Sequence, residues 1–155
     1  MKVAVVQIRG TIRMHPKLKD TLKFLNLTRK NSCVVVDNSR NYLGMIIKVK
    51  DYVTWGEIRE DVFKELLKKR GRVAGNKLLT EEYLKSNAGT SFDELAKAFF
   101  EGKIRLRDVP GLKPFFKLVP PRGGFERGGI KKHYSLGGAL GYRGENINNL
   151  VGRML

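Results

Sequence analysis

Short apolar runs alternate with helically spaced apolar residues through the first third of the chain. The runs VAVVQIR at 3–9 and CVVV at 33–36, with a shorter segment at 52–54, have the composition of buried strands. Between them, apolar side chains recur every three or four residues, first from Leu18 to Leu25 and then from Tyr42 to Val49. The pattern predicts strand, helix, strand, helix, strand over residues 1–56, with the helices on one side of a small sheet.

Two capping-box spacings indicate longer helices beyond this unit. Thr54 with Glu57 predicts a helix whose apolar stripe ends before Gly71. Ser91 with Glu94 predicts a second helix with several aromatic residues on its apolar face. These stripes are typical of core packing.

The remaining elements are shorter. We expect a short helix at 81–85, a strand at 115–119 that the following pair of prolines ends, and a terminal helix at 145–154. Between the last two lies a basic, glycine-rich loop, residues 120–144. The region 57–155 therefore reads as a mostly helical extension of the first unit.

The glycine-rich stretch is expensive to order. Residues 119–144 contain eight glycines, five Lys or Arg and one acid, and few aliphatic side chains. Fixing each residue costs roughly 1 to 2 kcal/mol of chain entropy, and glycine loses the most. We expect an external partner to order this loop, because its own apolar burial cannot offset that cost.

Charge indicates the kind of partner. The chain has 31 Lys and Arg against 15 Asp and Glu, a formal net charge of +16. Residues 1–55 carry +8, residues 56–110 carry +2 and residues 111–155 carry +6, so both ends are cationic around a nearly neutral middle. This distribution favours a nucleic acid as partner, with a membrane surface as a distant second.

Enzymatic chemistry has few candidates. Cys33 stands alone in an apolar strand, so it cannot form an internal disulfide, and with His15 and His133 it cannot complete a tetrahedral zinc site. The chain lacks phosphate-binding glycine motifs of the nucleotide-binding enzymes. We expect no catalysis, no metal, no cofactor and no small-molecule substrate. With no run of about 18 apolar residues, we expect a soluble, cytoplasmic protein without membrane contact.

The candidate nucleic-acid contacts lie at loops and element ends, where long side chains can reach a partner. In the first unit they are Arg9, Arg13, His15, Lys17, Lys19, Arg29, Lys30, Asn31 and Arg40. In the glycine-rich loop they are Arg122, Arg127, Lys131, Lys132, Tyr142 and Arg143. Cations interleaved with aromatic rings on a flexible backbone suit irregular RNA better than duplex DNA, which favours RNA as the partner.

The turn from Gly141 to Gly144 leaves a second interpretation open. A G-x-x-G turn that opens a helix is the loop with which KH domains clamp an RNA backbone. The chain could accordingly be a freestanding, KH-like regulatory protein that binds single-stranded RNA.

Several stretches together resemble a known family. VVQIRGTIRMHPKLKDTLKFLNLTRKN, DNSRNYLGMI, LVPPRGGF and GYRGENINNLVGRML are similar to the archaeal long form of universal large-subunit ribosomal protein thirty, the family that includes eukaryotic large-subunit ribosomal protein seven. The resemblance implies an α+β fold, with a ferredoxin-like-related β-α-β-α-β core at 1–56 and a helical, glycine-rich C-terminal subdomain at 57–155.

The resemblance also implies a function. Members are structural constituents of the large (50S) ribosomal subunit and are not enzymes. They bind and organise 23S rRNA near the 5S rRNA region, which makes 23S rRNA the expected partner, 5S rRNA a second candidate, and large-subunit proteins the expected neighbours.

Overall fold

The computed structural model describes residues 1–155 apart from the side chain of Ala88. The elements are β1 (Lys2–Gln7), α1 (Pro16–Phe24), β2 (Ser32–Asp37), α2 (Arg40–Lys48), β3 (Val53–Glu57), α3 (Glu60–Arg70), α4 (Glu81–Ala88), α5 (Phe92–Phe100), β4 (Phe116–Lys117), β5 (Gly141–Tyr142) and α6 (Ile147–Met154). The α+β fold and the order predicted for the first unit are confirmed. Among the described residues, no helix is both long and apolar enough to cross a membrane.

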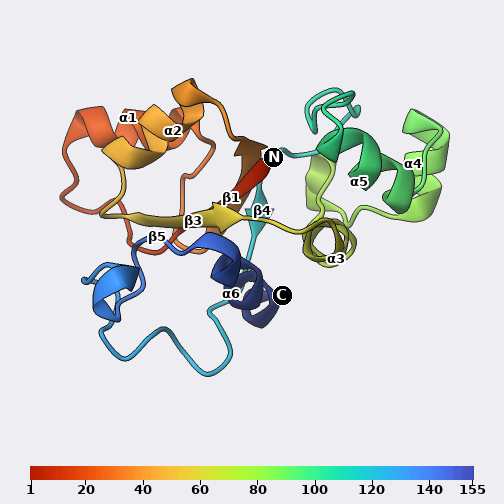
Figure 1. Cartoon of the computed structure of the whole chain (residues 1–155). Helices are drawn as coiled ribbons and strands as arrows, with labels where there is room; N and C mark the ends of the chain where they lie inside the picture. Colours follow the sequence, from red (N-terminus) through yellow and green to blue (C-terminus); the bar gives the residue numbers. More distant parts are fainter.

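One mixed sheet runs through the molecule in the order β4-β2-β1-β3-β5 (Figure 1). The central strand β1 is antiparallel to both neighbours, with Val5 opposite Val34 on one side and Trp55 on the other. The outer strands both come from the C-terminal part of the chain: β4 pairs with the start of β2, and β5 runs parallel to β3. The extension therefore continues the same sheet.

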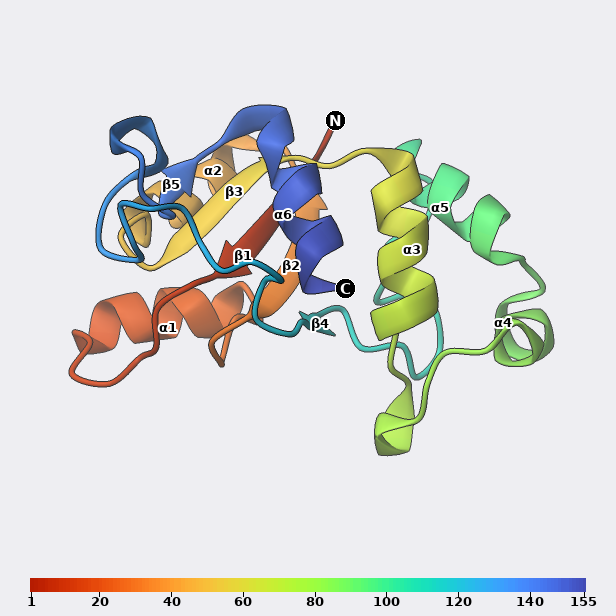
Figure 2. The ribbon, with the colours of Figure 1, turned by 90° about the horizontal axis from the view of Figure 1, so that it is seen from below.

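The two faces of the sheet are buried by different parts of the chain. Because side chains alternate along a strand, Val3 and Val5 pack toward α1 and α2, whereas Ala4 and Val6 face the opposite layer. That opposite layer contains α3, α5 and α6. Figure 2 shows α6 crossing this face, with α3 beside it and α4 at the outer end of the helical extension. This two-sided burial explains why β1 is apolar at nearly every position.

Helices begin where the sequence predicts when the start signal is a short capping motif. Ser91 and Glu94 form the predicted capping box at α5, and Thr80 caps α4. The capping box expected at Thr54 is wrong, because Thr54 lies inside β3, where its hydroxyl donates to the Gly141 carbonyl. Helix α3 instead begins at Glu60, after Arg59.

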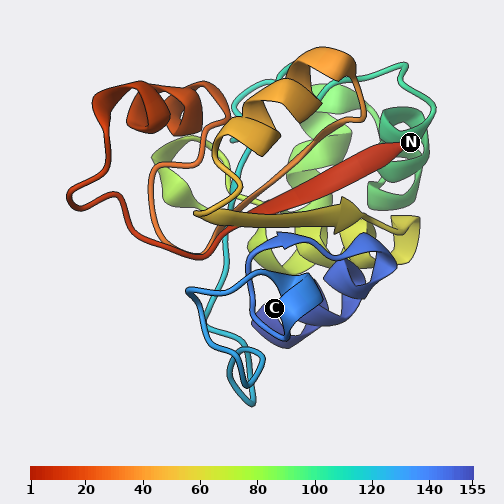
Figure 3. The same cartoon turned by 60° about the vertical axis from the view of Figure 1, so that its left-hand side comes forward.

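The glycine-rich segment has internal support that composition did not reveal. It folds beside the sheet before returning along β3 as β5 (Figure 3). Backbone bonds from Gly128 to the Gly137 carbonyl and from Ala139 to the Gly129 carbonyl hold it together, and Ala139 and Leu140 are buried. The expectation that this segment has little to offset the chain entropy lost when it becomes ordered therefore needs correction.

Candidate nucleic-acid interface

The sheet topology gathers cationic segments at one end of the molecule. At this end β1 and β4 finish while β2, β3 and β5 begin. Four connecting segments therefore have an end there: the one after β1, the one before β2, the one before β3, and the one that joins β4 to β5. We call this surface the basic end.

Arg9 leaves β1 at the basic end and is partly held in place. Its guanidinium donates to the Asp51 carbonyl over 3.2 Å and stacks over the Tyr52 ring at 5.0 Å. The connection before β3 thus fixes the position of this cation.

Arg29 and Lys30 are exposed immediately before β2. Asn31, beside them, serves the backbone of the junction: its N–H donates to the Gln7 carbonyl, and its carbonyl accepts from Leu118. Its φ of 63° is one that Asn tolerates better than most residues. Asn31 thus ties β1, β2 and the end of β4 together beneath the two cations.

The start of α1 presents the next group of candidates. Arg13 lies in a turn with φ of 57° and is exposed, as are Lys17 and Lys19 on the helix. His15 is the N-cap of α1, because its Nδ1 accepts from the Lys17 backbone N–H over 3.3 Å. Only Nε2 of His15 therefore remains for an external partner.

The glycine-rich segment contributes further exposed cations, Lys131 and Lys132. The Lys132 carbonyl accepts from Leu140, just before β5, which sets this pair close to the basic end. Next to them, His133 Nε2 lies 3.2 Å from an Asp51 carboxylate oxygen, so the segment also contacts the connection before β3. Lys117, at the end of β4, is an exposed cation that the sequence pattern did not single out.

Four further candidates are also exposed. Arg40 is exposed at the start of α2, where β2 has finished. Arg122 and Arg127 are exposed earlier in the glycine-rich segment. Tyr142 is exposed on β5, and its hydroxyl donates to Glu57 over 2.8 Å, which together with slight burial raises the pKa of Tyr142.

Arg143 requires a correction, because the structure buries it. The side chain is 1 % exposed and forms a two-pronged ion pair with Glu126, with nitrogen–oxygen distances of 2.7 and 3.2 Å. It also donates to Thr54 and to the Ala139 carbonyl, and stacks over Tyr134 at 4.5 Å. Arg143 is an internal clamp of the glycine-rich segment and is not available to an external phosphate.

The clamp also sets the charge of Glu126. Partial burial raises the pKa of its carboxyl, but the hydrogen bonds from Arg143 and the positive charges of Arg143 and Arg153 outweigh that effect and leave the pKa below its ordinary value. Glu126 is therefore ionised at neutral pH and neutralises the buried guanidinium.

The G-x-x-G turn is not free to clamp RNA. Gly141 pairs with Thr54, and the Arg143 backbone N–H donates to the Trp55 carbonyl over 3.0 Å. A Cβ on Gly56 would collide with the Gly144 carbonyl, so β3 and the turn lie in direct contact. The backbone that a KH-like loop would present to phosphates is used inside this fold.

The described residues include neither a candidate metal centre nor an activated thiol. No group of three or more His, Cys, Asp or Glu side chains there is placed to hold a metal ion. Cys33 is fully buried, and burial raises the pKa of its thiol to about 12, as expected for a core side chain. Its interpretation as packing is confirmed.

Comparison with known proteins agrees with these features. The family model described as ribosomal protein L30p/L7e matches residues 3–53. Large ribosomal subunit protein uL30 of Methanopyrus kandleri is 51 % identical over 96 % of this chain and 100 % of its own length. The proteins of the same name from Nanoarchaeum equitans and Methanococcus vannielii are each 50 % identical, over 98 % and 100 % of this chain and 97 % and 100 % of their own lengths. The resemblance seen in the sequence is thereby confirmed, and the chain belongs to the uL30 family of large ribosomal subunit proteins, the L30p/L7e family.

Proposed function

We propose that this protein is a structural, non-enzymatic constituent of the large (50S) ribosomal subunit that binds 23S rRNA near the 5S rRNA region. It acts in the cytoplasm, within the ribosome, among neighbouring large-subunit proteins. The observation that carries the proposal is the basic end, where cations from well-separated segments share one surface.

The geometry supports binding to the phosphate backbone of folded RNA. Arg29, Lys30, Lys131 and Lys132 are exposed and project from connections that the sheet holds in place. Phosphate contacts of this kind fix the position and orientation of a protein on a nucleic acid without reading sequence. A rigid sheet that carries several such connections can hold separate RNA elements in a fixed relation.

The alternative of a KH-like regulator has less support. Its loop from Gly141 to Gly144 is packed against β3, and the cation within it is buried. We therefore retain the ribosomal role as the proposed function.

The salt dependence of binding tests the proposal. Binding to a 23S rRNA transcript is measured by filter retention at several salt concentrations. Each phosphate contact contributes about 0.7 to 0.9 to the slope of log affinity against log salt. Replacing four cations of the first unit by serine should flatten that slope by roughly 3; they are Arg13, Lys17, Arg29 and Lys30.

A matched control separates specific contacts from net charge. Four exposed lysines of the helical extension are replaced by serine instead; they are Lys69, Lys85, Lys97 and Lys103. This variant has the same net charge and should keep the wild-type slope. Equal slopes for the two variants would remove the first-unit cations from the interface.

A further inference from the structure

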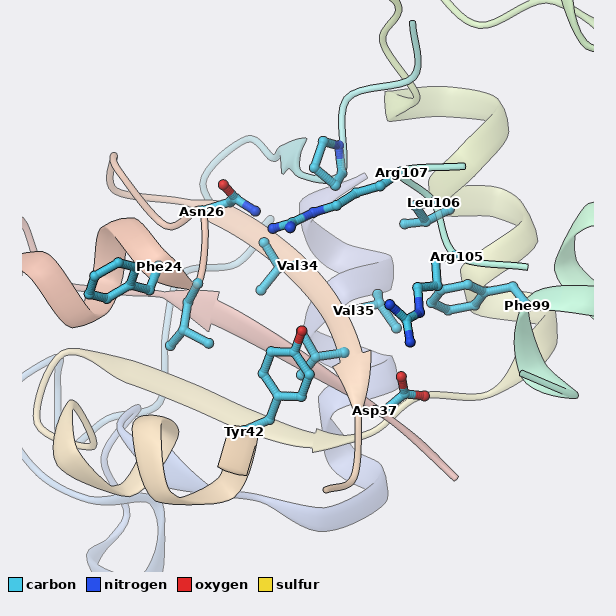
Figure 4. Close-up of a pocket in the computed structure, with 13 residues that line it drawn as sticks. Phe24, Asn26, Val34, Val35, Asp37, Tyr42, Phe99, Arg105, Leu106 and Arg107 are labelled. Carbon is cyan, nitrogen blue, oxygen red and sulfur yellow. The ribbon is translucent and has the colours of Figure 1, made fainter. Parts of the chain in front are cut away.

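A groove opens beside β2, along the edge that faces away from β1. It has a volume of about 210 Å³ and lies between β2 and the segment 105–107 that follows α5. Figure 4 shows Phe24 and Tyr42 on the side of α1 and α2, with Arg105 and Arg107 approaching from the opposite side. The side chain of Arg107 extends across the groove toward Asn26.

The floor of the groove is a strand edge without a neighbour. Strand β4 pairs only with Ser32 and Cys33, so from Val34 to Asp37 the edge of β2 that faces away from β1 has no strand beside it. The Leu118 N–H bonds to the Asn31 carbonyl on this side, and alternation along an antiparallel ladder turns the N–H and C=O of Val35 the same way. A donor and an acceptor of the backbone therefore face the groove.

An exposed aromatic ring stands at the rim. Phe24 is the last residue of α1 and is 74 % exposed, although the other side of the same helix is buried through Leu22. The ring contributes little to the core. Together with the half-buried Tyr42, it offers flat apolar surface at the mouth of a concave site.

The charge of the groove is positive. Arg105 and Arg107 are exposed, and neither guanidinium has an ion pair or hydrogen bond within the part of the chain that the structure describes. Asp37, the one acid among the lining residues, is paired with Lys2. The unneutralised charges at the rim therefore favour an anionic occupant.

We infer that this groove holds one unpaired nucleotide of the bound RNA, with its base against Phe24 and Tyr42 and a flanking phosphate at Arg105 and Arg107. Aromatic stacking, cations for phosphate and polar groups for base edges are the contacts by which proteins hold unstacked bases. The Val35 backbone groups supply the donor and acceptor for the base edge. This inference rests on the proposed function and assigns it a specific nucleotide site.

Size argues against an added peptide strand, the other natural occupant of an open edge. Pockets for drug-sized ligands enclose roughly 300 to 1,000 Å³. At about 210 Å³ the groove is smaller, and fits one planar ring system better than four residues of extended chain with their side chains.

Two variants of the full chain test the site against a 23S rRNA transcript. Phe24→Ala removes a stacking surface, so affinity should fall roughly 5- to 150-fold while the salt slope stays unchanged. Arg105→Ser with Arg107→Ser removes both cations from the one flanking phosphate, so the slope should flatten by about 0.7 to 0.9. Leu78→Ala, at another exposed apolar residue, is the matched control and should bind like wild type.

Ultraviolet crosslinking of the wild-type complex, followed by mass spectrometry, gives a second measurement. A nucleotide adduct on the tryptic peptide that contains Phe24, or on the one that contains Tyr42, supports the site. Wild-type affinity of the Phe24→Ala variant, or adducts confined to other peptides, would overturn it. Normal rRNA binding by that variant with loss of a neighbouring protein from reconstituted subunits would also overturn it, in favour of a peptide.

The failure of this inference is distinguishable from that of the proposed function. If the four-cation variant of the first unit keeps the full salt slope, the proposed function fails. If that variant loses the slope as expected while Phe24→Ala binds like wild type, only the nucleotide site fails.

Discussion

Removing Glu126 should destabilise the protein more than its position in a glycine-rich segment suggests. The side chain of Arg143 is 1 % exposed in the folded protein, and Glu126→Ala leaves the two N–H donors that faced the carboxylate without their partner. Breaking a buried ion pair in this way costs about 3 to 5 kcal/mol. Because Glu126 is itself 22 % exposed, water can partly replace it, and we expect a loss near the lower limit, about 3 kcal/mol.

Thermal and urea unfolding measure this loss. A loss of about 3 kcal/mol corresponds to a Tm lower by roughly 6 to 12 °C for a chain of this size. Glu145→Ala is the matched control, because Glu145 pairs with Arg59 on the surface, where both side chains are more than half exposed. Such a pair contributes less than about 1 kcal/mol.

A double-mutant cycle isolates the pair itself. Arg143→Met removes the buried charge, so the combination with Glu126→Ala should be less destabilised than the sum of the two single changes. If Glu126→Ala changes stability no more than Glu145→Ala does, then Arg143 reaches water and the clamp does not exist as described.

The pH dependence of stability gives an independent test of the ion pair. The pKa of Glu126 is lowered in the folded state, so its pairing contributes stability above the ordinary pKa of 4.5 and loses it as pH falls through the lowered value. The stability difference between wild type and Glu126→Ala should therefore shrink in acid. A difference that stays constant to low pH would contradict the assignment.

Three further measurements examine the fold. Gly56→Ala should destabilise the protein by about 1 to 3 kcal/mol, because the added Cβ would meet the backbone of the turn after β5. Gly44→Ala is the control: Gly44 lies on α2 with open space around it, so this change should stabilise the protein by about 0.5 to 1 kcal/mol. Equal effects of the two changes in chemical denaturation would refute the close contact at Gly56. Ser91→Ala should lower the free energy of unfolding by about 1 kcal/mol in the same assay, and an unchanged value would mean that the capping box does not stabilise α5. In hydrogen exchange without RNA, the amides of Ala139 and Leu140 should exchange more slowly than those of exposed loops. Fast exchange at both amides would show that the glycine-rich segment is disordered without RNA.

Local signals predicted much of the fold. Ser91 and Glu94 lie three residues apart, so their capping box is visible in sequence alone. The apolar run of β1 predicted a buried strand, and the structure buries all six of its residues. Whether residues 1–56 form a unit on their own stays a prediction.

Prediction from short sequence motifs was wrong where long-range contacts determine the structure. Thr54 has capping-box spacing to Glu57, but its partner is Gly141, 87 residues away, and strand pairing determines its structure. Arg143 looked like a surface cation because it lies in a glycine-rich stretch, between Tyr142 and Gly144. One signal was available: Glu126 is the one acid among the five cations of 119–144, and a lone acid in such company is a candidate for an internal pair.

The interface residues were predictable as a class and less so as a surface. Arg29 and Lys30 were identified from charge at an element end, which is a local property. Their proximity to the glycine-rich segment depends on β5 lying parallel to β3, which no short motif encodes. Arg105 and Arg107 were overlooked because their significance comes from the open edge of β2 opposite them.

The placement of β4 and β5 at the two borders of the sheet bears on how the polypeptide is made. During synthesis, β1, β2 and β3 emerge long before the strands that flank them, and at about 5 to 20 residues per second the delay lasts several seconds. Throughout that interval the nascent chain displays two bare borders and an apolar surface that awaits α6. Prematurely terminated products should therefore aggregate, and prompt capture by a chaperone would protect the unfinished chain.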